Sequence, residues 1–276
     1  MTRDDAADLA LVGGIAALVG GVAWLLWPKD AAGASLAYAP AATPQEVAVS
    51  RVPMPAFLAA APPAGAARER YFEAAVDAPT WVPVNLGSGV VINVSADVVK
   101  AQGIRVPLWP STAQRVADRF GAMLPTKRLV DAIWRAGDVK LTPRSIQPHD
   151  GIGRNDLRMI ADYDAMINAA VAGRGGLIVN GKKDIIVGRA LATDSGKRAV
   201  WIYGWIRSDG TPVQPVYGGH SSVYVDGSHG VRLVSRTAYV NGVATPIEQL
   251  FANPTTAALL NEGGTLTPEM LVYPRA

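Results

Sequence analysis

The sequence contains no cysteine. This absence excludes thiol nucleophiles, disulfide bonds and thiolate metal ligands together, and it leaves the redox compartment of the protein undetermined. Histidine is scarce as well, with three in 276 residues. Imidazole chemistry is therefore confined to His149, His220 and His229.

The sequence also lacks a long run of lysine or arginine. Its 26 basic and 23 acidic side chains give a formal net charge of +3, whereas a nucleic-acid-binding surface normally shows a concentrated basic patch. We therefore expect no nucleic-acid partner. With 49% hydrophobic and 18% charged residues, the chain is too apolar to be disordered throughout and long enough to bury one sizeable core.

One long hydrophobic run lies near the N-terminus. Leu9 to Trp27 reads LALVGGIAALVGGVAWLLW without a charge, and a helix of that length spans a hydrocarbon core of about 30 Å. We expect a tail over residues 1–8, a transmembrane anchor over residues 9–28 that contacts the membrane, and an extracytoplasmic C-terminal bulk. Small residues spaced by seven would also permit self-association of this helix; they are Gly13, Gly14, Gly20 and Gly21.

Other interpretations of this run stay open. A buried helix of a soluble protein seldom runs so long without a polar residue. A cleaved signal peptide usually begins with basic residues, whereas this chain begins MTRDDAAD, although Ala32-Gly33-Ala34 is compatible with cleavage and secretion. Association with a phage virion is a further alternative address.

The next segment differs in composition from the rest of the chain. Residues 29–68 are rich in alanine and proline, which favours an extended, semi-rigid tether. Val52 to Pro62 carries a short apolar cluster in this segment, and docking of this piece on the domain is the alternative. We expect residues 69–276 to form one globular domain.

Helix signals occur in the first part of this domain. Two strands over residues 81–86 and 89–94 come first, joined by Gly87-Ser88-Gly89. A capping box at Ser111–Gln114, a cap at Thr126 and a start at Asn155 then predict three helices.

After Gly173 the hydrophobic period changes from 3.6 to 2, which predicts strands. Hairpin dipeptides at Asn180-Gly181, Asp209-Gly210 and Asn241-Gly242 make neighbouring strands antiparallel. A capping box at Thr245–Glu248 and the pair Asn253-Pro254 predict short final helices. We therefore expect an α+β domain with one antiparallel sheet of about six strands and three to five helices packed on it; the strand candidates are residues 177–179, 182–187, 199–207, 211–217, 222–226 and 231–240.

Three sequence blocks follow one another between Val106 and Val234. They read VPLWPSTAQRVADRFGAMLPTKRLVDAIWRA, GKKDIIVGRAL and VWIYGWIRSDGTPVQPVYGGHSSVYVDGSHGVRLV. In these blocks the chain resembles a widespread uncharacterised family of bacterial and phage-encoded proteins. The resemblance implies a single domain and transfers no activity. The chain departs from the family pattern at Ile206, where a histidine often follows Tyr-Gly-Trp, and at Gly227, where a tyrosine often stands.

The stretch HSSVYVDGSHGVRLV, from His220 to Val234, holds two histidines, an aspartate and three serines. Asp226 and His229 are the first and fourth residues of a predicted turn, so their backbones lie within about 7 Å. We expect Asp226 to orient His229 as a general base, with the hydroxyl of Ser222 or Ser228 as the nucleophile. The alternative is a plain hairpin, because aspartate, glycine and serine are ordinary turn residues.

Further residues are assigned to the same site. We expect His220, Asp226 and His229 to border one concave surface at the end of the sheet, and its apolar walls are predicted to be Tyr203, Trp205 and Tyr217. Two lysines are candidates for binding an acidic group of the substrate, with a solvated strand edge as the alternative; they are Lys182 and Lys183.

We predict no cofactor, and zinc is the alternative. Imidazole and carboxylate ligands from His220, Asp226 and His229 suit zinc in a chain without cysteine. An extended chain between residues 220 and 226 would separate its ends by roughly 20 Å. Such a site would therefore need a bend or ligands from His149 and Asp150.

These features predict a membrane-anchored extracytoplasmic hydrolase that acts on cell-wall material through a His-Asp dyad, with peptidoglycan or another envelope polymer as its partner. A non-enzymatic structural or binding protein of a phage virion or of the cell envelope is one alternative. A metal-dependent hydrolase built from histidine and aspartate is another.

The anchor leads to a direct prediction. Deleting residues 1–30 should release a soluble, folded domain, because the apolar run and not the domain holds the chain in the membrane. Fractionation and circular dichroism of the truncated chain measure this. An aggregated truncated chain beside a full chain that is soluble without detergent would assign the run to the core.

Overall fold

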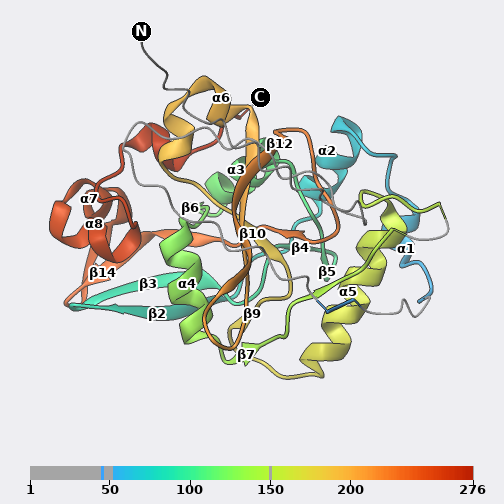
Figure 1. Cartoon of the computed structure of the whole chain (residues 1–276), viewed down its shortest axis with the longest axis horizontal. Helices are drawn as coiled ribbons and strands as arrows, with labels where there is room; N and C mark the ends of the chain where they lie inside the picture. Colours follow the sequence, from blue (N-terminus) through green and yellow to red (C-terminus); the bar gives the residue numbers. More distant parts are fainter. Residues whose placement is uncertain (1–44, 47–51, 149–150, 276) are drawn as a thin grey trace, which may run out of the picture. The chain divides into compact units, whose positions relative to one another are not determined.

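The structure is a computed structural model, and it describes residues 45–46, 52–148 and 151–275 (Figure 1). The chain divides into Met1–Pro40 and Ala41–Ala276, and every described residue belongs to the second unit. The predicted anchor with its four glycines, most of the tether, and His149 and Asp150 lie outside the described residues. Within the described ranges, no helix is both long and apolar enough to cross a membrane.

The domain is a mixed α+β fold with antiparallel strand pairs and several helices, as predicted. The expected single sheet of six strands is wrong, because the strands divide into two larger sheets. The first has the order β12-β11-β10-β13, with β10 at Lys183–Ile185, β11 at Ala199–Ile206, β12 at Pro212–Ser221 and β13 at His229–Gly230. The second has the order β15-β14-β3-β2, and β6 also pairs with β14; its strands are β2 at Trp81–Gly87, β3 at Val90–Ser95, β6 at Ala122–Met123, β14 at Val234–Val240 and β15 at Val243–Pro246.

Short strand pairs and helices complete the described residues. The pairs are β1 (Gln45–Glu46) with β8 (Arg144–Ser145), β4 (Lys100–Ala101) with β5 (Ile104–Arg105), and β7 (Val139–Lys140) with β9 (Ile178–Val179). The helices are α1 (Ala56–Ala59), α2 (Ala66–Ala74), α3 (Pro110–Arg119), α4 (Lys127–Ala136), α5 (Leu157–Val171), α6 (Asp194–Lys197), α7 (Ile247–Ala252) and α8 (Pro254–Leu260), with 3₁₀ turns at Arg189–Ala192 and Pro268–Leu271.

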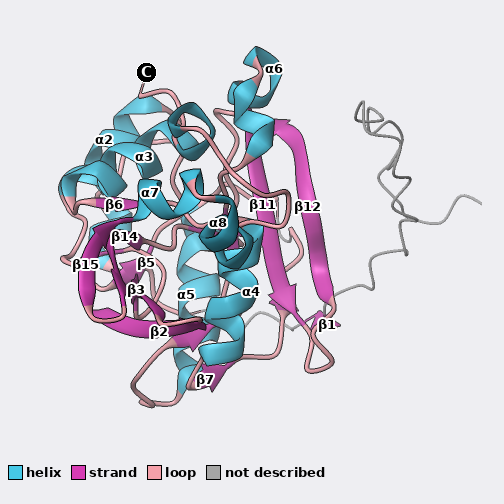
Figure 2. Ribbon diagram, turned by 90° about the vertical axis from the view of Figure 1, so that its left-hand side faces the viewer, coloured by secondary structure: helices cyan, strands magenta, loops and turns pink. Residues whose placement is uncertain are grey.

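Helix α4 lies between the two sheets. It contacts β11 of the first sheet and β2 of the second, and Figure 2 shows it with the β11–β12 pair on one side and β2 and β3 on the other. Its buried side chains are Leu129, Val130 and Ile133. One large apolar cluster joins residues of both sheets to α3, α4, α7 and α8, so a single core supports both sheets.

Two predicted hairpins of the second half are present and one is wrong. Asp209-Gly210 joins β11 to β12, and Asn241-Gly242 joins β14 to β15. Asn180-Gly181 joins strands that pair with other partners, since β9 pairs with β7 and β10 pairs with β11. The Asn180 side chain instead hydrogen-bonds the backbone N–H of Ile206 at 2.9 Å and the carbonyl of Leu141 at 3.0 Å. A side chain engaged with two distant segments overrides the local turn preference.

The strand predicted over residues 222–226 is wrong. The backbone N–H of Tyr224 donates to the carbonyl of Ser221 at 3.0 Å, so the chain turns where β12 ends. Residues 225–234 are all buried, which no half-exposed strand would show. The predicted strand over residues 231–240 is correspondingly shorter, because β14 begins at Val234 in the second sheet.

Helix caps are partly as predicted. Thr126 and Asn253 accept hydrogen bonds from Leu129 N and Thr255 N at the starts of α4 and α8. The capping boxes at Ser111–Gln114 and Thr245–Glu248 are absent, because α3 and α7 begin after Trp109 and Pro246 without a side-chain cap. Helix α5 is capped by Asp156 rather than Asn155, whose side-chain oxygen accepts from Arg68 instead.

Part of the predicted tether packs on the domain. Leu58 on α1 is fully buried in the core, and the rings of Phe57 and Tyr71 stack with centroids 4.9 Å apart. Helix α2 spans Ala66–Ala74 and therefore crosses the predicted boundary between the tether and the domain at residues 68 and 69. The apolar piece Val52–Pro62 therefore belongs to the folded unit, which was the alternative for it.

Arg105 joins β5 to α5 through a buried ion-pair network. The side chain is 1% exposed. Its Nε donates to Asp97 Oδ2 and its Nη1 to Asp164 Oδ1, both at 2.9 Å. Removing one member of a buried pair leaves an uncompensated charge, which is far more costly than losing a surface pair.

We predict that Arg105→Leu lowers the free energy of unfolding of the full chain by about 3 to 5 kcal/mol. Urea unfolding measures the loss. The control is Arg115→Leu, because Arg115 and its partner Glu73 remain 30% and 23% exposed; its loss should be at most about 1 kcal/mol. Equal losses would contradict the assignment of Arg105 as the buried tie.

Candidate functional site

The segment 222–228 links opposite edges of the first sheet. It leaves β12 at one edge and enters β13, where His229 and Gly230 pair in parallel with Lys183 and Asp184 of β10. The predicted turn is present, since His229 N donates to Asp226 O at 3.0 Å. His229 therefore lies in the strand at the opposite edge of the sheet from the strand of His220, and the two strands do not form a hairpin.

Two glycines allow this close passage. A Cβ on Gly227 would lie 2.7 Å from a ring carbon of Tyr163, and one on Gly230 would lie 2.8 Å from Val98 and 2.9 Å from Lys182. Contacts this short are not tolerated in a packed interior. The segment is consequently held against α5 on one side and β10 on the other.

Asp226 is bonded mainly to its own turn. Its Oδ1 accepts from the Ser228 backbone N–H at 2.7 Å and from the Ser228 hydroxyl, and its Oδ2 accepts from the Tyr224 hydroxyl at 3.3 Å. The distance from Asp226 Oδ2 to His229 Nε2 is 3.6 Å, which is a contact rather than a hydrogen bond. The expected nucleophile arrangement is absent from the described residues, because Ser228 donates to the carboxylate and no hydroxyl group there hydrogen-bonds a ring nitrogen of His229.

His229 is completely buried, with 0% exposure. Among the described residues, neither of its ring nitrogens has a hydrogen-bond partner. Burial lowers the pKa of His229 to about 4, although the charge of Asp226 opposes the shift. The ring is therefore neutral at pH 7.

The carboxylate beside it stays ionised. Burial alone would raise the pKa of Asp226. His229 opposes this only when its ring is protonated, whereas the charge of Lys183 and the hydrogen bonds from Ser228 oppose it at every pH, and the pKa of Asp226 lies below its usual range. Hydrogen bonds to the charged form are sufficient to keep a buried carboxylate ionised.

His220 lies near the end of β12, and the turn that follows brings Tyr224 and the chain leading to His229 back beside it. Its ring stacks on Tyr224 with centroids 3.9 Å apart, and Tyr217 meets it edge-on at 5.1 Å. The centroids of His220 and His229 are 6.4 Å apart, so the extended separation of roughly 20 Å expected between residues 220 and 226 does not occur. His220 is half-buried, and burial lowers its pKa below the ordinary value, with Lys183 adding to the effect.

The walls predicted from β11 divide between two faces. Trp205 packs near Tyr163 in a cluster beside the site. Tyr203 packs with Val130 on the other face, and its hydroxyl donates to Asp131 at 2.7 Å. Tyr203 is therefore not part of the site, whereas Tyr217 and Trp205 are. Ser222 lies in the turn, half-buried, with its backbone N–H bonded to Arg198 O.

The two lysines also differ from each other. Lys182 is 3% exposed, donates to the carbonyl of Gly227, and lies over the Tyr163 ring at 5.6 Å. Burial lowers its pKa to about 8. A solvated strand edge is therefore wrong for Lys182. Its buried ammonium stabilises the turn at Asp226–His229 through the carbonyl of Gly227. Lys183 places its ammonium over the Trp205 ring at 4.9 Å.

Sequence reasoning missed Tyr224, Tyr163 and Arg154 as members of the site. Tyr224 lies in the stretch His220 to Val234, but its alternation with Ser222 and Asp226 predicts only a strand face. Tyr163 comes from α5 and Arg154 from the loop before it, so nothing in their local sequence connects them to residue 229.

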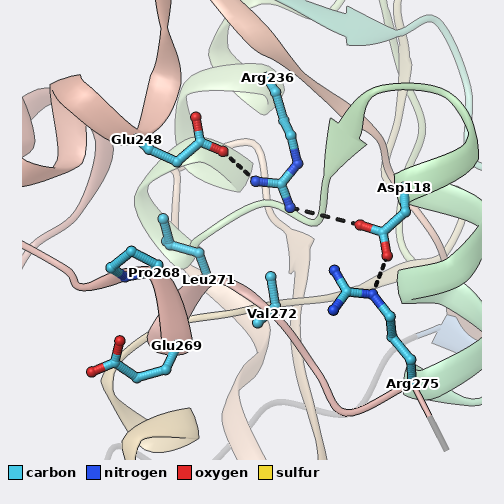
Figure 3. Close-up of a pocket in the computed structure, with 8 residues that line it drawn as sticks. All are labelled: Asp118, Arg236, Glu248, Pro268, Glu269, Leu271, Val272 and Arg275. Carbon is cyan, nitrogen blue, oxygen red and sulfur yellow. Dashed lines mark hydrogen bonds and ion pairs between the residues drawn. The ribbon is translucent and has the colours of Figure 1, made fainter.

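The described residues hold a further pocket and no metal cluster. Over the described residues, no group of three or more histidine, aspartate or glutamate side chains is arranged to hold a metal ion; the zinc alternative stays a prediction. A pocket of about 490 Å³ lies elsewhere, lined by charged side chains and by Pro268, Leu271 and Val272. Figure 3 shows Arg236 between Glu248 and Asp118, with Arg275 on the same Asp118. These ion pairs occupy four of the five charged side chains of that pocket, and the fifth is Glu269.

Comparison of the chain with protein-family models, with curated proteins and with solved structures finds no match.

The burial of His229 predicts a pH dependence of stability. An exposed histidine titrates near 6.5 and His229 near 4, so the unfolded chain binds more protons between these values. The wild type should lose about 2 to 3 kcal/mol as pH falls from 7 to 4.5, and His229→Leu should lack this loss. Urea unfolding of both proteins at each pH measures it, and the comparison cancels the opposite titration of Asp184, whose pKa burial raises to about 6. Parallel profiles would contradict a neutral, buried His229.

Proposed function

We propose that the protein is a membrane-anchored extracytoplasmic hydrolase of cell-wall material, in which His220 acts as the general base that activates water. The apolar run from Leu9 to Trp27 supports the address. The observation that carries the chemistry is the half-buried His220 ring, stacked on Tyr224 next to the buried His229. This imidazole is the one of the pair that a substrate can reach.

The neighbouring residues have a positioning role in this proposal. Asp226 accepts from the Tyr224 hydroxyl, and Tyr224 stacks on His220. The ionised carboxylate therefore orients the His220 ring indirectly, through the side chain of Tyr224. His229 is neutral and packs against Tyr224 with centroids 5.7 Å apart. It adds an uncharged wall and does not exchange protons with the substrate.

Water is the nucleophile that fits this arrangement, because the Ser228 hydroxyl is committed to Asp226. His220 is neutral at pH 7 and offers a ring lone pair. It takes a proton from water while the water oxygen bonds to the amide carbonyl carbon of a cell-wall peptide. The proton then passes from the imidazolium to the amide nitrogen as the carbon–nitrogen bond breaks, and the ring returns to its neutral form.

This mechanism predicts that His220→Gln lowers the rate of hydrolysis of purified peptidoglycan at least about 100-fold, the typical contribution of a positioned general base. Tyr224→Phe should lower it less, because the ring stack survives without the hydroxyl. The matched control is Tyr239→Phe, a 38% exposed tyrosine on β14, which should leave the rate unchanged. Hydrolysis by correctly folded His220→Gln at the wild-type rate would refute the base assignment.

A non-enzymatic structural or binding role in the envelope or a phage virion is the second candidate. It is favoured by the complete burial of His229, whose ring nitrogens are bonded by no hydroxyl group of the described part of the chain. In that case the wild type would release no soluble fragments from peptidoglycan, and His220→Gln would co-sediment with it as the wild type does.

A further inference from the structure

Strand β11 has an irregular backbone conformation at Trp205. Trp205 has φ +52° and follows Gly204 at φ +131°, and the register between β11 and β12 shifts at Ile202/Gly204. A bulky residue at positive φ is a strained outlier. Without this bulge Trp205 would share a face with Tyr203; with it, the indole lies beside Lys183.

The irregular backbone at Trp205 brings its indole N–H close to the Lys183 ammonium, and neither group has an acceptor among the described residues. The Trp205 indole N–H is buried and has no partner in the described part of the chain. The Lys183 ammonium lies over the same indole, and no hydrogen bond or ion pair of this half-buried group is found among the described residues. A buried donor without a partner is costly, so the indole N–H beside a cation without a contacting anion points to a missing acceptor.

A second positively charged residue lies nearby, because the Arg154 carbonyl accepts from the Gly227 backbone N–H at 3.0 Å, beside the Tyr163 ring that packs in one cluster with Trp205. Arg154 is exposed, and its guanidinium donates to Gln147 Oε1 at 2.9 Å. Burial lowers the pKa of Lys183, Asp226 opposes this, and the charge of Arg154 adds to it. The two cations repel each other, and the oxygens of Asp226 already accept from Ser228 and Tyr224. A further anion would relieve this repulsion.

We propose that Lys183, Trp205 and Arg154 form a subsite for a free carboxylate of the peptide substrate, beside the pair of histidines. The inference rests on the proposed hydrolase and narrows its substrate to acidic peptides. The ammonium and guanidinium supply charge, and the indole N–H supplies a directed hydrogen bond to one carboxylate oxygen. The subsite binds without a covalent step.

Binding by the full chain in detergent tests this without any need for hydrolysis. The probes are N-acetyl-alanyl-alanine and its C-terminal amide, which differ only in the carboxylate. The acid should bind the wild type about tenfold tighter than the amide, as expected for one charge-assisted contact. The indole N–H resonance of Trp205, identified by its loss in Trp205→Phe, should shift with the acid and not with the amide.

Lys183→Met keeps the stem over the indole and should bring the two affinities within about twofold. Lys140→Met is the matched control, because Lys140 lies over Trp134 at 5.2 Å in the same manner, and it should keep the preference. If Lys183→Met fails to fold, Arg154→Gln at the exposed position should still weaken the acid about threefold.

Equal binding of acid and amide by the wild type, no binding of either, or equal effects of Lys183→Met and Lys140→Met would overturn the subsite. Carboxylate-dependent binding without peptidoglycan hydrolysis would retain the subsite and refute the hydrolase. Hydrolysis with no carboxylate preference would do the reverse.

Discussion

The parallel pairing of His229 and Gly230 with Lys183 and Asp184 is the constraint on which the candidate site depends. It forces the chain to cross from one edge of the first sheet to the other in a few residues. That crossing buries residues 225–234 and turns His220 and Tyr224 toward His229. The lack of space at Gly227 and Gly230 fixes the path, so the ring positions follow from backbone packing rather than from hydrogen bonds between the rings.

Burial then determines the charge of each group. Without water, the imidazole of His229 is more stable neutral, whereas Asp226 keeps its charge because its own turn and Lys183 stabilise it. The buried Lys182 ammonium stabilises the same turn by donating to the carbonyl of Gly227. The buried layer is thus a rigid support, and the half-buried layer of Tyr217, His220 and Tyr224 is where a ligand can make contact. In the proposed hydrolase, this division gives Asp226 a positioning role and His220 the role of general base.

Local sequence signals predicted those features whose causes are local. The turns at Asp209-Gly210 and Asn241-Gly242, the caps at Thr126 and Asn253, and the Asp226–His229 turn arise within a few residues, and each is present. The alternation Ser222, Tyr224, Asp226 also resembles a strand, but its environment comes from α5 and β10. Likewise Asn180-Gly181 is not a hairpin because Leu141 and Ile206 bind its side chain. Trp205 and Tyr203 are predicted together as walls of the site, but only Trp205 belongs to it, because a bulge in β11 separates their faces. The membership of Tyr163 depends on tertiary packing, which no local pattern encodes.

The central claim is that two neighbouring histidines differ in role, one buried and neutral, the other accessible and basic. Histidine Cε1–H chemical shifts, followed by NMR from pH 8 to 4.5 and assigned by single substitutions, measure both protonation states directly. The account predicts that the His229 signal stays constant until about pH 5, while the His220 signal titrates at higher pH, below the ordinary histidine pKa. A His229 signal that titrates near pH 6.5, like an exposed histidine, would contradict it.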